Sequence, residues 1–221
     1  MFSDAIQMLI EPTFSTIYMV VGSTIVSLLL GVPLGILLCV TSAGNLIPKP
    51  MLNNILGRVI NILRSFPFII LMILAFPLSR WIVGTSIGTT AAIVPLSVAA
   101  APFVARIIET ALKEVNPELI QAAKAMCSSN MQIIFKAMIP EAYPSLVSGV
   151  TLTIINIIGY SAMSGAVGGG GLGDVAIRYG YQRFRVDIMI GAVFAIILMV
   201  ELTQFLGDRI VGNIMKKRGL I

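Results

Sequence analysis

Long apolar stretches, separated by short polar segments, make up most of this chain. Five stretches are long enough to cross about 30 Å of hydrocarbon as helices, because an α-helix rises about 1.5 Å per residue. They cover approximately residues 17–40, 59–78, 89–108, 143–167 and 188–206. The pattern predicts an all-α membrane protein with five transmembrane helices in a single domain, residues 1–221. We expect residues 1–16 to form a lead-in along the interface.

Glycines and prolines add detail to two of these spans. Gly31 and Gly35 form a G-x-x-x-G pattern, which lets another helix approach closely. We expect that helix to come from the same chain rather than from a second copy. Pro67 and Pro77 predict bends in the second span.

Composition supports a membrane location and excludes several chemistries. Of the 221 residues, 57% are hydrophobic and 11% are charged, against roughly 25% charged in soluble domains. The absence of histidine excludes Ser-His and Cys-His catalysis and His-based metal sites. Basic residues do not alternate with aromatic ones, so we expect no nucleic-acid partner. We therefore expect neither an enzyme nor a metal site.

The distribution of Lys and Arg predicts the orientation in the membrane. With five spans and the C-terminus in the cytosol, eleven of the 15 basic residues lie inside. These are Lys49, Arg58, Arg64, Arg106, Lys113, Lys124, Lys136, Arg209, Lys216, Lys217 and Arg218. The four left outside are Arg80, Arg178, Arg183 and Arg185. The N-terminus is therefore predicted to lie outside.

Residues 113–140, between the third and fourth spans, are helical in pattern but too polar for lipid. Asn116 is suited to an N-cap, and Pro117 is suited to the first helical position. Ser129 and Gln132 have the spacing of a capping box, which predicts a second short helix ending at Pro140. This loop is predicted to face the cytosol.

The first helix of that loop has two predicted faces. The face expected to pack contains Leu119, Ala122, Ala123 and Met126. The open face contains Glu118, Gln121, Lys124, Ala125 and Ser128. Pattern alone leaves two interpretations equally open: an ordinary amphipathic loop, or a docking helix that fits a groove in a cytosolic partner.

A resemblance favours the docking helix. Gln121-Ala122-Ala123, followed by Cys127 and then by Ala137 to Pro140, resembles the "EAA" motif of ABC-importer permeases. The resemblance implies that residues 118–128 form the coupling helix that seats in an ATPase subunit. Gln121 stands where the family has Glu, and Cys127 where it has Gly. Glycine at a turn permits a positive φ that cysteine adopts only with strain.

Polar residues within the spans are candidates for a passage. Asn156, Tyr160, Ser161 and Met163 place hydrogen-bonding groups and a flexible thioether inside the fourth span, where packing and a gate are equally open interpretations. Glu201 lies inside the fifth span and predicts either a functional carboxylate or a packing group bonded to Gln204.

Two further features of the chain bear on ligands. We expect the charge of Arg64 to snorkel to the interface, with a role in the pathway as the alternative. The glycines from Gly168 to Gly173 match G-x-G-x-x-G, but they follow a membrane helix rather than a strand, so we expect no nucleotide there. The chain has no P-loop sequence and therefore no such ATP site of its own.

A wider set of motifs resembles the permease subunit of the bacterial methionine ABC importer. They are Arg64 to Phe68, Ile82 to Gly88, Ala91 to Leu96, Ala101 to Arg106, Gly159 to Met163 and Gly168 to Gly173. The resemblance implies the type I importer permease fold in the bacterial cytoplasmic membrane, working by alternating access. It implies a homodimer within membrane lipid, two ATPase subunits that bind ATP and Mg, and an extracytoplasmic substrate-binding lipoprotein.

The substrate implied by this resemblance is methionine, as either enantiomer and as derivatives. We expect no cofactor on this chain. Another amino acid or glycine betaine is an alternative substrate, because related permeases share the Gly-rich loop and the EAA pattern. An ATPase-independent channel or secondary transporter is the alternative mechanism, and it would have no need of a docking helix.

Overall fold

The structure, a computed structural model, describes residues 2–219 and the side chains of residues 7–219. Its long helices are α1 (Phe2–Thr41), α2 (Pro50–Ser65), α5 (Thr89–Lys113), α9 (Tyr143–Ser164) and α11 (Val186–Lys217). The short elements are α3 (Phe68–Leu74), α4 (Phe76–Val83), α6 (Pro117–Ala125), α7 (Asn130–Gln132), η1 (Ile133–Met138), α8 (Ile139–Glu141), η2 (Gly165–Val167), α10 (Gly171–Val175) and η3 (Ala176–Tyr181). Residues 2–219 contain no strand, which confirms the all-α fold.

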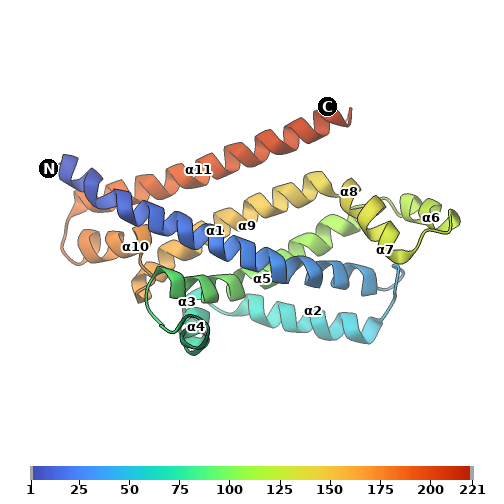
Figure 1. Ribbon diagram of the computed structural model, residues 1–221, viewed down its shortest axis with the longest axis horizontal. Helices are drawn as coiled ribbons and strands as arrows, with labels where there is room; N and C mark the ends of the chain where they lie inside the picture. Colours follow the sequence, from blue (N-terminus) through green and yellow to red (C-terminus); the bar gives the residue numbers. More distant parts are fainter. Residues whose placement is uncertain (1, 220–221) are drawn as a thin grey trace.

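The long helices lie roughly along one axis (Figure 1). In chain order α1, α5 and α11 run one way, while α2 and α9 return. The N-terminus lies at one end, and the C-terminus lies at the other end with α6 (Figure 1). Among the described residues, four helices are long and apolar enough to cross a membrane, and the number becomes five if the bent pair of α2 and α3 is counted as one span.

The second span is not the single helix predicted for residues 59–78. Proline disfavours helical dihedrals in the residue before it, and Phe66, before Pro67, has φ −68° and ψ 131°. Here α2 ends, and α3 continues at an angle of 102° to it. The bend expected at Pro67 is thus confirmed, but it is a break between separate helices.

The predicted lead-in over residues 1–16 is also wrong within the described residues, because α1 is continuous from Phe2. Its first turns are held against the Gly-rich segment. The Thr16 hydroxyl, buried to 2% exposure, accepts a 2.9 Å hydrogen bond from the backbone N–H of Leu172. This contact joins α1 to α10 and fixes the N-terminal part of α1.

The G-x-x-x-G pattern packs α1 on α5 within the chain, as predicted. A Cβ added at Gly31 would lie 2.6 Å from the Val104 side chain, and one at Gly35 would lie 2.6 Å from the carbonyl oxygen of Ala105. No larger side chain fits such distances, so the two glycines permit the close approach of α1 and α5.

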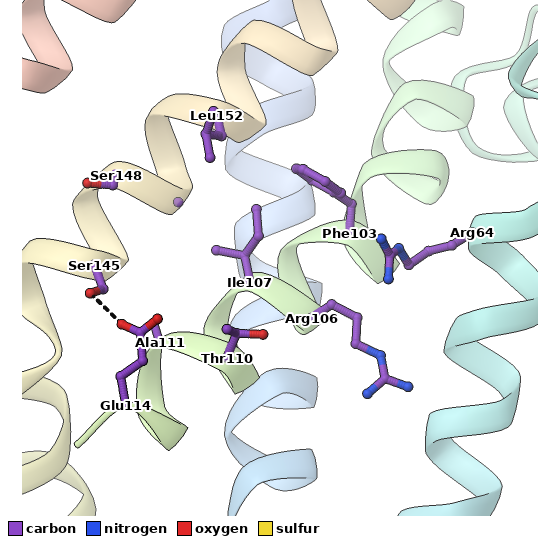
Figure 2. Close-up of a pocket in the computed structure, with 11 residues that line it drawn as sticks. Arg64, Phe103, Arg106, Ile107, Thr110, Ala111, Glu114, Ser145, Ser148 and Leu152 are labelled. Atoms are coloured by element: carbon purple, nitrogen blue, oxygen red, sulfur yellow. Dashed lines mark hydrogen bonds between the residues drawn. The ribbon is translucent and has the colours of Figure 1, made fainter. Parts of the chain in front are cut away.

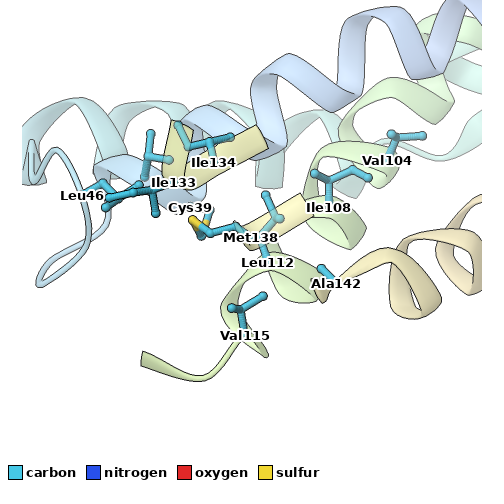
Figure 3. Packing of buried hydrophobic residues seen from close by; sticks show 11 residues of the cluster. Cys39, Leu46, Val104, Ile108, Leu112, Val115, Ile133, Ile134, Met138 and Ala142 are labelled. Carbon is cyan, nitrogen blue, oxygen red and sulfur yellow. The ribbon is translucent and has the colours of Figure 1, made fainter. Parts of the chain in front are cut away.

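A buried apolar cluster lies at the α6 end of this pair (Figure 3). Cys39, Leu112 and Met138 are at its centre and are at most 1% exposed. They come from α1, α5 and η1. The cluster therefore ties the segment after α6 to the two central helices.

Pro140 does not end the short helix, contrary to the prediction. The preceding turn, η1, is a π-helix in which Ile139 bonds to the carbonyl of Ile134. Its wider i to i−5 turn lets the chain pass a proline, whose ring would clash with the carbonyl four residues earlier in an α-helix. Helical structure thus continues through α8.

Candidate functional site

Helix α6 is capped at both ends although none of its residues is buried. The Asn116 side chain accepts a 2.9 Å hydrogen bond from the N–H of Glu118, which confirms the predicted N-cap. The next helix begins with the predicted capping box of Ser129 and Gln132. Local hydrogen bonds therefore hold a helix that packs little against its own chain.

The face of α6 that packs differs from the predicted one. Ile120 and Ala123 are the residues that touch the buried cluster around Met138. Leu119 and Met126 are 39% and 81% exposed. Helix α6 therefore contacts the cluster through Ile120 and Ala123, one turn apart, and the larger side chains of Leu119 and Met126 stay exposed at the surface. Ala122 joins the open face with the other exposed residues, Glu118, Gln121, Lys124 and Ala125.

The end of α6 explains the position where Cys127 replaces glycine. Cys127 has φ +57°, in the left-handed region. Its N–H bonds to the carbonyl of Lys124, and the N–H of Ser128 bonds to the carbonyl of Ala123. This pair of bonds is the Schellman motif, in which the residue after the C-cap is left-handed. The predicted positive φ is confirmed.

A groove runs between α5 and α9 (Figure 2). Its volume is about 490 Å³. Glu114 lies at one end, where it accepts a 2.8 Å hydrogen bond from the Ser145 hydroxyl, and Arg64 enters from α2 (Figure 2). Phe103 and Leu152 form part of its apolar wall.

A smaller cavity of about 230 Å³ shares Arg64 and Phe103 with that groove. Asn156 and Tyr160 of α9 line it, together with apolar side chains from α2 and α3. The ring of Tyr160 stacks on that of Phe68, with centroids 4.5 Å apart. The two cavities thus follow one face of α9.

Of the four residues predicted to line a passage, two line that cavity. Asn156 and Tyr160 line the smaller cavity, and Met163 is 48% exposed near the end of the same helix. Ser161 is fully buried and donates to the carbonyl of Ile158 in its own helix. Successive helical residues are rotated by about 100°, which turns Ser161 away from the cavity and into the protein.

Glu201 is exposed on α11 rather than buried. The expected packing partner, Gln204, instead donates a 2.8 Å hydrogen bond to Asp208. Within residues 7–219, the carboxylate of Glu201 makes no hydrogen bond or ion pair. The predicted bond between Glu201 and Gln204 is therefore absent among the described residues, because the Gln204 amide bonds one turn further along α11.

A buried cluster of charged side chains on α5 was not among the residues predicted from the sequence. The carboxylate of Glu109, 5% exposed, lies 2.6 Å from a guanidinium nitrogen of Arg106 and 2.7 Å from the Lys113 ammonium. Arg106 also donates to the Gly57 carbonyl and to the Asn61 side chain. The cluster joins α5 to α2. The i, i+3 and i, i+4 spacing of these charges was visible in the sequence.

Comparisons with known proteins agree on one family. The family model described as "Binding-protein-dependent transport system inner membrane component" matches residues 31–219. The probable D-methionine transport system permease protein MetI of Vibrio cholerae is 48% identical over 207 residues, covering 94% of this chain and 92% of that protein. The methionine import system permease protein MetP of Bacillus subtilis is 43% identical over 182 residues, 82% of each.

The fold agrees with these relatives. A solved structure of the MetNI methionine ABC transporter, in inward-facing conformations, matches with a TM-score of 0.93 at 44% identity. The match covers 95% of this chain and 97% of that chain. Since the family model and these relatives span most of the sequence, this multi-pass membrane chain belongs to the family of binding-protein-dependent transport system inner membrane components.

Proposed function

We propose that this chain is the permease subunit of an ATP-driven importer and forms the path by which methionine crosses the bacterial cytoplasmic membrane. The observation that carries the proposal is α6, which is capped at both ends while none of its residues is buried. A helix so well held yet so little packed suits a partner surface. The relatives named above are methionine permeases and support the substrate.

The partner of α6 is a cytosolic ATPase subunit, and ATP and Mg bind there rather than on this chain. The docking surface consists of the exposed residues of α6 and of the turn that follows it: Glu118, Gln121, Ala122, Lys124, Ala125, Met126 and Cys127. Ala123 and the half-buried Ser128 support it from behind. The Lys and Arg distribution favours placing this end, and the C-terminus, in the cytosol.

Motion of α6 reaches the membrane through the buried cluster. Ile120 and Ala123 rest on it, and Leu112 and Met138 belong to it. Close-packed side chains transmit displacement, so ATP-driven closure of the ATPase subunits moves α6 together with α5 and the start of α9. This movement alternates the opening of the pathway between the two sides.

A second copy of the chain completes the pathway. The groove and the smaller cavity along α9 together carry polar side chains, among them Arg64, Asn156 and Tyr160. Hydrocarbon would leave these groups unsolvated at a large cost, whereas a homodimer covers them and encloses the groove. Met163 extends this face toward the outer end, where its flexible side chain suits a gate. A substrate-binding lipoprotein delivers methionine at that end.

Cysteine labelling tests the docking surface directly. Cys127 is exposed on α6, and Cys39 is buried. A maleimide should label Cys127 rapidly in the purified chain and at least about tenfold more slowly after the ATPase subunit is added, as interface cores exclude water. A cysteine introduced as Ala166→Cys, at the opposite end, should label equally in both states. Equal labelling of Cys127 with and without the ATPase contradicts the proposed docking.

A further inference from the structure

The small cavity beside α9 concentrates polar groups that have no partner in the protein. Arg64, Asn156 and Tyr160 all line it. Within residues 7–219, none of their side-chain nitrogen or oxygen atoms makes a hydrogen bond or ion pair; the Arg64 guanidinium contacts the face of Phe103, and the Tyr160 ring stacks on that of Phe68. Pockets in which a few unpaired polar groups converge between apolar walls are typical of small-ligand sites.

The position of Arg64 differs from that of the neighbouring arginine. Arg106 is satisfied by Glu109, Gly57 and Asn61. Arg64, in the last turn of α2, keeps its guanidinium free and directs it toward the groove from the side of α2 (Figure 2). A cation without a counter-ion in a membrane helix is costly, so such residues commonly meet a charged ligand.

We propose that Arg64 binds the carboxylate of the transported amino acid during passage, with the substrate's side chain held between the stacked pair of Phe68 and Tyr160 on one side and Phe103 on the other. This inference rests on the proposed function and adds the binding group within the pathway. The planar guanidinium matches a carboxylate with two parallel hydrogen bonds. The Asn156 side-chain oxygen can accept a hydrogen bond from the ammonium group of the same ligand.

The cavity also limits the class of ligand. A volume of about 230 Å³ is below the range of about 300–1,000 Å³ that holds drug-sized ligands, so one small molecule fits. The aromatic walls favour an uncharged side chain, and a thioether gains contacts with ring edges. The free positive charge of Arg64 repels cationic substrates. The site therefore suits an α-amino acid with an uncharged, largely apolar side chain.

Photolabelling of the assembled permease–ATPase complex in lipid nanodiscs, without the binding protein, tests this site. The probe is a diazirine analogue of methionine that keeps the amino and carboxyl groups, and mass spectrometry locates the label. We expect labelled peptides that contain Phe68, Phe103 or Tyr160. Methionine should displace the probe, and methioninol, which has a hydroxymethyl group in place of the carboxylate, should need about tenfold more, as expected for losing a charge-assisted bond.

Variants on α2 separate the role of Arg64 from a general charge effect. Arg64→Gln should lower labelling at least about tenfold, and Arg64→Lys should restore part of it. Arg58→Gln, on the same helix but outside the cavity, should label like the wild type. If Arg64→Gln fails to assemble with the ATPase, the comparison of methionine with methioninol still tests whether the site binds the carboxylate, because it uses the wild-type complex.

Three results would overturn the assignment: label outside the cavity, equal competition by methioninol, or unchanged labelling of an assembled Arg64→Gln complex. The last result would mean that Arg64 only snorkels to the interface. ATP-dependent methionine uptake by the wild type, measured in parallel, separates this inference from the proposed function. Uptake without labelling in the cavity rejects the Arg64 site alone, whereas absence of uptake rejects the importer itself.

Discussion

The rings of Phe68 and Tyr160 stack with their centroids 4.5 Å apart and their planes 4° from parallel. Phe68 is the first residue of α3, directly after the break at Pro67, and Tyr160 lies on the face of α9 that lines the smaller cavity. The pair therefore fixes the broken span against the helix that borders the pathway.

Removal of this stacked pair should loosen the pathway. An aromatic pair contributes about 0.5–1.5 kcal/mol beyond the area it buries, so Phe68→Ala should shift the balance of states about twofold to tenfold. We expect faster ATP-independent efflux of methionine from loaded vesicles. Phe205→Ala serves as the control, because Phe205 is exposed on α11 and has no ring partner among residues 7–219. Equal efflux from both variants would mean that Phe68 has no role in closing the pathway and serves only in packing.

Charge on the open face of α6 should separate the subunits. Ala122 is exposed, so Ala122→Glu adds charge and bulk to the docking surface without entering the core. We expect co-purification of the ATPase to fall at least about tenfold, since an unpaired charge in an interface core costs several kcal/mol. Ala122→Ser, a small change at the same position, should keep wild-type recovery. Full recovery with Ala122→Glu would place the docking surface elsewhere.

Glycine at position 127 should stabilise the turn after α6. A left-handed non-glycine residue is strained by about 1–2 kcal/mol, and glycine relieves this strain at a smaller entropic cost. Cys127→Gly should therefore raise the local stability of this turn by about 0.5–1 kcal/mol, which is measured as slower amide hydrogen exchange. Ser128→Gly is the matched control and should speed exchange, because Ser128 has no positive φ to relieve. The opposite order of the two variants would show that the turn is unstrained.

The buried carboxylate of Glu109 should be needed for stability. Removing one partner from a buried ion pair costs about 3–5 kcal/mol, and because the side chains of Arg106 and Lys113 are 27% and 47% exposed, we expect about 2–3 kcal/mol for Glu109→Ala. The measurement is the thermal or denaturant midpoint of the purified complex. Glu201→Ala, which removes an exposed carboxylate that has no partner among residues 7–219, should not lower it. Equal effects would contradict the buried cluster.

Local signals in the sequence predicted much of the docking helix. Asn116 and the Ser129 capping box act through bonds to residues two or three positions away, so their roles are visible without the fold. The left-handed turn at Cys127 was implied instead by the family resemblance, because the motif has glycine at this position. The prediction that Gly31 and Gly35 pack within the chain also held, because small-residue spacing reports on backbone approach.

Features that depend on tertiary context were less accessible. Pro67 predicted a bend, but the hydropathy pattern contains no information on the angle of 102° between α2 and α3. Burial of Ser161 and exposure of Glu201 are decided by which neighbour covers each face, and a single helix pattern cannot supply that. Pro140 predicted the end of the short helix, because the π-helical turn that precedes it has no sequence signature of its own.

The most direct test of the account is uptake of radiolabelled methionine into vesicles that contain this chain, its ATPase and the binding protein. Each protein and ATP are omitted in turn. The account predicts uptake only when the chain, the ATPase, the binding protein and ATP are all present, with loss of uptake for Ala122→Glu and not for Ala122→Ser. Uptake by the chain alone would contradict coupling to an ATPase, and ATP-dependent uptake of a different amino acid or a betaine in place of methionine would contradict the substrate.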